Sequence, residues 1–133
     1  MPNMTKFIIT IIIFISFNTY CQNNSKSYNC YNTNLFKVLP DNSLKLINQK
    51  NEETTITLNN KTILIQGKIE GDTYLEQFII TGAKQDEDGL IVYTTNLSGE
   101  KGDLFMFFKD NIMRETFLKE MNQTVVQTYY YNK

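Results

Sequence analysis

Residues 104–119 read LFMFFKDNIMRETFLK, and this stretch decides the fold. Two apolar runs flank Asp110-Asn111, a pair that suits a two-residue hairpin loop because both side chains tolerate positive φ. An amphipathic helix would need an apolar period of about 3.6 residues through this stretch, and Thr116 and the Asp110-Asn111 break interrupt it. We therefore predict two antiparallel strands here, over residues 104–109 and 112–119.

The rest of the chain from residue 35 onward repeats this pattern. Short runs rich in Ile, Thr, Val, Tyr and Phe alternate with turn residues, such as Pro40-Asp41-Asn42-Ser43, and with longer connections, such as 71–72 and 98–102. A repeat of about ten residues without a helical segment indicates consecutive antiparallel strands. The other predicted strands cover residues 35–39, 44–48, 54–58, 61–69, 74–81, 90–97 and 124–131. The predicted fold class is all-β: a small antiparallel meander over residues 35–133 that closes as a barrel, a half-barrel or a sandwich.

Four aromatic residues are the candidates for a functional surface. Residues 104–108 are apolar on both faces, as in a strand that is covered on both sides, and Phe105 and Phe107 share one of these faces. Tyr129 and Tyr131 share a face of the last predicted strand, and tyrosine combines a rigid apolar body with a polar tip. We predict that these side chains either pack in the core or form a ligand or partner surface.

The first 21 residues have the layout of a secretory signal peptide. Lys6 precedes an apolar run over residues 7–17, after which the chain becomes polar. This run is shorter than the roughly 20 apolar residues that a membrane-spanning helix needs. We therefore predict a secreted, periplasmic or cell-envelope protein that meets the membrane only during export.

Cys21 marks the predicted end of the signal peptide, residues 1–21. Thr19 and Cys21 place small side chains at the two positions that a signal peptidase reads, so we predict cleavage after Cys21. The alternative is a lipoprotein in which Cys21 is retained and acylated. Tyr20 and Asn18 depart from the lipobox pattern, which makes this anchored form the less favoured one.

Residues 22–34 are polar and rich in Asn and Ser, and we predict a flexible mature N-terminus there. Cleavage after Cys21 would leave Cys30 as the single cysteine of the mature chain. No intramolecular disulfide could then form, so packing and strand pairing would have to stabilise the domain.

Composition excludes several classes of function. The chain has 13 basic and 14 acidic side chains and no basic cluster, so we expect no nucleic-acid partner. It has no histidine, which excludes Ser-His-Asp and Cys-His catalysis and the usual zinc sites. The six glycines form no phosphate-binding loop, and we expect neither a cofactor nor a metal ion.

Clustered carboxylates are the remaining enzymatic option. Glu70 and Asp72 flank Gly71, and Asp86-Glu87-Asp88-Gly89 forms an acidic loop. A glycosidase needs two nearby carboxyl groups, one of them kept protonated by apolar surroundings, and these residues lie in polar turns. The acidic loop also lacks the ligand spacing of an EF-hand. We interpret both segments as solvated turns.

Together these features favour a non-enzymatic binding module for a small apolar ligand or a protein. The expected architecture resembles lipocalin-like β meanders in its arrangement alone, and no family motif accompanies it. The alternative is a structural or interaction protein of the cell envelope that acts through an edge strand or through aromatic contacts. A carboxylate-based hydrolase ranks third.

Overall fold

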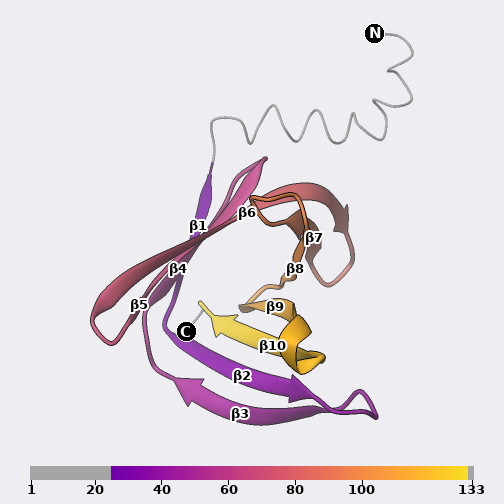
Figure 1. Cartoon of the computed structure of the whole chain (residues 1–133). Helices are drawn as coiled ribbons and strands as arrows, with labels where there is room; N and C mark the ends of the chain where they lie inside the picture. Colours follow the sequence, from indigo (N-terminus) through magenta and orange to yellow (C-terminus); the bar gives the residue numbers. More distant parts are fainter. Residues whose placement is uncertain (1–24, 132–133) are drawn as a thin grey trace, which may run out of the picture.

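The computed structural model describes residues 25–131, and in this part of the chain the strands form one antiparallel sheet. The sheet curls into a half-barrel (Figure 1). Its order is β1-β4-β5-β6-β7-β8-β9-β10-β2-β3. The strands are β1 Lys26–Cys30, β2 Asn32–Val38, β3 Leu44–Lys50, β4 Thr54–Leu58, β5 Thr62–Ile69, β6 Asp72–Gln85, β7 Leu90–Thr95, β8 Lys101–Phe107, β9 Asn111–Leu118 and β10 Gln123–Tyr130. A single 3₁₀ turn, η1 Lys119–Met121, joins β9 to β10.

The predicted all-β, antiparallel fold class is confirmed, and every predicted strand has a counterpart in the sheet. Of the three predicted forms of closure, the structure shows the half-barrel. The connection between β5 and β6 is shorter than predicted. Ile69 pairs with Asp72, and Glu70 and Gly71 both have positive φ, at 51° and 88°, as a two-residue hairpin turn requires.

The prediction of a flexible segment over residues 22–34 has to be corrected for residues 26–34. Lys26–Cys30 forms β1, and Asn32 begins β2. Tyr28 and Cys30 are buried because they alternate with Ser27 and Asn29, so a short strand turns both apolar side chains to one face. Ser27 and Asn29 lie on the other face and hydrogen-bond to Thr57 and Thr55 of β4, at 3.2 and 3.3 Å. The predicted signal peptide and Cys21 lie outside the described residues.

The two ends of the sheet belong to one bent hairpin. Tyr31 alone separates β1 from β2, and residues 51–53 separate β3 from β4. β1 pairs with β4 at one end of the sheet, whereas β2 pairs with β3 at the other. The chain itself therefore joins the ends of the curled sheet, and β2 also pairs with β10, the last strand.

The core lies on the face of the sheet that the curl encloses, which we call the inner face. Phe105 and Phe107 of β8 stack at 6.4 Å between ring centroids, and Phe78 and Tyr28 pack against them, each with a centroid distance of 5.4 Å. The buried apolar side chains of this face are Tyr28, Cys30, Ile56, Ile63, Ile65, Phe78, Val92, Phe105, Phe107, Ile112 and Tyr129. The opposite face of the sheet is called the outer face below.

Candidate functional site

An unbroken row of paired residues crosses the outer face over six strands. It runs from β3 to β7 through Leu46, Phe36, Val126, Glu115, Leu104 and Tyr93, each of which pairs directly with the next. Paired residues in antiparallel strands point to the same face, so their side chains lie side by side. Apart from Glu115, every member of the row is apolar or aromatic.

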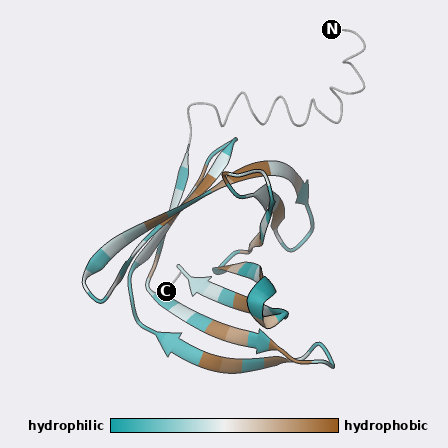
Figure 2. Cartoon of the chain, in the orientation of Figure 1, coloured by the Kyte–Doolittle hydropathy of each residue, from teal (hydrophilic) through white to brown (hydrophobic). Residues whose placement is uncertain are grey.

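Neighbouring rows extend this apolar surface. Met113 pairs with Met106, which pairs with Ile91, and Leu44 pairs with Val38 at the β3 end. Figure 2 shows hydrophobic residues grouped in the middle of β2 and β3. We call the whole set the outer apolar face: Phe36, Val38, Leu44, Leu46, Ile91, Tyr93, Leu104, Met106, Met113, Phe117 and Val126. Val126, in the middle of the row, is buried, whereas Leu46, Tyr93 and Phe117 are 50%, 46% and 57% exposed, so this face is open at β3 and again beside β7 to β9.

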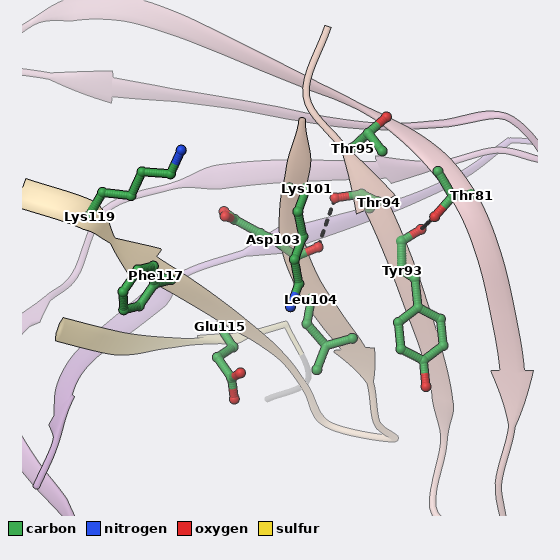
Figure 3. Close-up of a pocket in the computed structure, with 11 residues that line it drawn as sticks. Thr81, Tyr93, Thr94, Thr95, Lys101, Asp103, Leu104, Glu115, Phe117 and Lys119 are labelled. Carbon is green, nitrogen blue, oxygen red and sulfur yellow. Dashed lines mark hydrogen bonds between the residues drawn. The ribbon is translucent and has the colours of Figure 1, made fainter. Parts of the chain in front are cut away.

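A depression of about 630 Å³ lies in the outer apolar face beside β7, β8 and β9 (Figure 3). Tyr93, Leu104 and Phe117 supply its apolar lining. Figure 3 shows the side chains of Tyr93, Leu104 and Glu115 extending to the same side of the sheet. Lys101, Glu115 and Lys119 add charged groups, and Lys119 lies 3.4 Å from Glu100 in an exposed ion pair. The depression thus combines a mainly apolar lining with a few charged groups, which is the make-up of many binding sites.

Irregular pairing shapes this depression. The register shifts between Ile80 and Gly82 and again between Tyr93 and Thr95, so the strands bend locally. The Thr94 hydroxyl donates a hydrogen bond to the backbone carbonyl of Asp103 at 2.7 Å. A Cβ atom at Gly102 would lie 2.6 Å from the Thr94 hydroxyl oxygen, so a side chain there would force these strands apart.

A buried ionic cluster occupies the inner face and borders the depression, which Asp103 also lines. Arg114 of β9 donates from Nε to Asp103 at 2.6 Å, and from both terminal nitrogens to Glu76 at 3.0 and 2.9 Å. Its Nη1 also donates to the Tyr129 hydroxyl at 3.2 Å, and the Thr116 hydroxyl donates to Asp103 at 2.9 Å. We call Glu76, Asp103, Arg114, Thr116 and Tyr129 the inner ionic cluster.

The guanidinium of Arg114 is also enclosed by aromatic rings. Its Cζ lies 5.2 Å from the ring centroid of Phe78 and 5.9 Å from that of Phe105. Burial works to lower the pKa of Arg114, but the hydrogen bond with Glu76 and the nearby Tyr129 and Asp103 raise this pKa overall. Arg114 therefore stays positively charged, and it pairs with both carboxylates of the cluster. This arrangement stabilises the sheet and leaves neither carboxylate free to act as a general base.

The four predicted surface residues come together, but on the inner side. Phe105, Phe107 and Tyr129 are buried in the core, and burial raises the pKa of Tyr129 to about 12. Tyr131 is half-buried, packs on Tyr28 at 4.8 Å, and donates a hydrogen bond to the carbonyl of Phe108. These residues are core components, so the exposed apolar surface has to be sought on the outer face.

The outer apolar face and the inner ionic cluster were both missed by sequence reasoning. One indication of the outer apolar face was present in the sequence, because Leu104 and Met106 make β8 apolar on both faces. Arg114 and Glu115 are adjacent and both charged, so alternation alone cannot decide which of them points inward. The pairing of β2 with β10 brings Phe36 and Leu46 into the row from a distant part of the chain.

No family model, curated protein or solved structure matches this chain. Its function therefore has to be inferred from its own geometry.

The two acidic segments, around Gly71 and over residues 86–89, lie in turns. Glu70 and Asp72 are exposed in the β5–β6 hairpin, and the 86–89 loop closes with a hydrogen bond from Asp86 N to the Gly89 carbonyl at 2.8 Å. Within residues 25–131, no cluster of three His, Cys, Asp or Glu side chains is arranged to hold a metal ion. In the same residues, no helix is long and apolar enough to cross a membrane.

Cys30 yields a prediction about pH dependence. Its thiol is buried beside Tyr28, and burial raises the pKa of Cys30 to about 12. The unfolded thiol has a pKa of about 8.5, so the unfolded state loses its proton first as pH rises. We expect the free energy of unfolding to fall between about pH 8.5 and pH 12, which urea denaturation at several pH values measures.

The control for this prediction is the variant Cys30→Ala. In this variant the free energy of unfolding should fall less steeply below about pH 10, while the fall at higher pH that is due to Tyr129 should remain. Peptide mapping gives a second readout. At neutral pH, alkylation of Cys30 should be about 100-fold slower in the folded protein than in urea, as an opening cost of about 3 kcal/mol implies. Equal alkylation rates in both states would contradict the buried position.

Proposed function

We propose that this protein is a non-enzymatic binding module that holds a protein partner on its outer apolar face. The observation that carries the proposal is the row from Leu46 to Tyr93, which is apolar or aromatic except at Glu115 and continues around the depression near Phe117. Soluble proteins seldom expose a contiguous apolar surface of this kind unless it binds something. A row across six strands of the outer face also offers the broad, open contact of a protein interface more than the enclosure that a small ligand requires.

The depression suggests the chemistry of the partner. Tyr93, Leu104 and Phe117 would surround an inserted apolar side chain, in the manner of an interface anchor. Lys101, Glu115 and Lys119 would meet polar groups of the partner at the edge of this contact. Glu115 is exposed and makes no ion pair within the described residues, so a basic group of the partner would complement it.

We further propose that the partner is met outside the cytoplasm, as a secreted or cell-envelope protein would require. Lys6 and the apolar run over residues 7–17 support this location. The absence of histidine and the occupied carboxylates of the inner ionic cluster support a role without catalysis.

Site-specific photo-crosslinking in the native host tests the binding proposal. A photoreactive phenylalanine analogue at Tyr93 should give an adduct of one discrete mass, because this side chain lies in the row and is exposed. The same analogue at Leu75, a 63% exposed residue of β6 outside the row, should give no adduct. Mass spectrometry of the adduct then distinguishes a protein from a small ligand.

Phe117→Asp supplies the matched variant. Burying an aspartate at the depression should reduce the adduct at least about tenfold, which corresponds to about 1.4 kcal/mol. Leu97→Asp is the control, since Leu97 is 66% exposed and lies in the turn after β7. Circular dichroism should be unchanged in both variants. An adduct that survives Phe117→Asp, or no adduct at Tyr93, would refute the outer apolar face as the binding surface, and a small-molecule adduct would favour the ligand-binding alternative.

A further inference from the structure

β3 is an open edge of the sheet. It is last in the strand order, it pairs with β2 alone, and all seven of its residues are exposed. An edge strand presents unpaired N–H and C=O groups along its free side. The Gln49 N–H is already directed to the side chain of Asn48, at 2.8 Å, instead of to another strand. An added strand could replace this local bond with a backbone pair.

The two faces of β3 differ in chemistry. Leu44 and Leu46 pair with Val38 and Phe36, so they extend the outer apolar face to the edge. On the other face, Lys45 pairs directly with Lys37, and Lys50 pairs with Thr33. None of these three lysines forms an ion pair within residues 25–131. Like charges placed directly opposite each other destabilise a sheet, so an anionic neighbour would relieve this repulsion.

We infer that β3 docks an extended segment of another protein in which apolar and acidic residues alternate. The segment pairs with the free edge by backbone hydrogen bonds. Because side chains alternate between the two faces of a strand, its apolar residues lie beside Leu44 and Leu46 while its acidic residues lie beside Lys45 and Lys50. This inference goes beyond the proposed function, because edge pairing does not require the depression near Phe117.

Charge distinguishes this occupant from a second copy of the same chain. Two β3 strands side by side would bring Lys45 and Lys50 of both copies onto neighbouring edges, with no carboxylate in β3 to offset them. Lysines at an edge strand often serve to prevent such self-association. The same lysines attract a strand that carries glutamate or aspartate at alternate positions.

Two short synthetic peptides test the inference, one alternating valine with glutamate and the other alternating valine with lysine. Hydrogen exchange should show new protection of the amides of Leu44–Lys50 with the acidic peptide and none with the basic one. Fluorescence anisotropy should show that the double variant Lys45→Glu, Lys50→Glu weakens binding of the acidic peptide at least about tenfold. Binding should also weaken in about 0.5 M salt, because both lysines are exposed.

Leu44→Pro and Phe117→Asp separate the parts of this inference. Leu44 is the first residue of β3, where proline is tolerated. Its N–H points to the free edge, because the neighbouring pair is the hydrogen-bonded one, with the Leu39 N–H donating to the Ser43 carbonyl, so binding should be lost in a folded variant. Phe117→Asp should leave peptide binding unchanged, which separates a failure of this inference from a failure of the proposed function. Equal binding of both peptides, no binding of either, or protection outside β3 would overturn it. Concentration-dependent dimers with protection at β3 would overturn it in favour of self-association.

Discussion

Replacing Arg114 with alanine is expected to lower the free energy of unfolding by about 3–5 kcal/mol. The change removes the partner of Asp103, whose side chain is only 11% exposed, and leaves a carboxylate confined in the core. Glu76 contributes less to the loss because its side chain is 40% exposed and can be hydrated. Urea denaturation followed by tyrosine fluorescence measures the change.

The double variant Arg114→Met, Asp103→Leu is the control for this result. It replaces the buried pair with apolar side chains, and such replacements are often neutral or stabilising. We expect the double variant to recover most of the stability that Arg114→Ala loses. If Arg114→Ala costs less than about 1 kcal/mol, the inner ionic cluster is hydrated and the structural role assigned to it is wrong.

The second large effect is expected at Phe105. Phe105→Ala should cost about 3–5 kcal/mol, because this fully buried ring packs on Phe78, Phe107 and the guanidinium of Arg114. The matched control is Leu104→Ala, one residue earlier on the outer face, where a half-buried side chain should cost only about 1 kcal/mol. Thermal and urea unfolding of the two variants compare the faces directly. A larger cost at Leu104 than at Phe105 would reverse the assignment of inner and outer faces.

The strands could be predicted from the sequence because their signals are local. Asp110-Asn111 between two apolar runs is enough to predict the β8–β9 hairpin, and similar turn residues mark most of the other strands. β1 was missed because its contribution to the core is only Tyr28 and Cys30, embedded in polar residues. The partner strand β4 supplies the pairing that makes this segment ordered.

The candidate sites could not be predicted because they depend on register between distant strands. Glu76, Asp103 and Arg114 come from β6, β8 and β9, and nothing in the local pattern of any one strand indicates that they meet. The outer apolar face likewise needs β2 and β3 to lie beside β10. Leu46 and Tyr93 enter one row only after that long-range pairing is known.

The bent hairpin that joins the ends of the sheet also has a consequence for how the protein folds. Most of its strands pair with a neighbour in sequence, but β2 pairs with β10, from Asn32–Val38 to Gln123–Tyr130. Such a contact raises the contact order and is slow to form, because the ordering entropy of the whole intervening chain has to be lost first. On a ribosome, β2 cannot pair with β10 until the last strand is made, and until then Phe36 lacks its neighbour Val126. Substitutions that weaken β10 should therefore impair closure of the entire sheet. A chaperone would bind the hairpin of β2 and β3 before it pairs with β10.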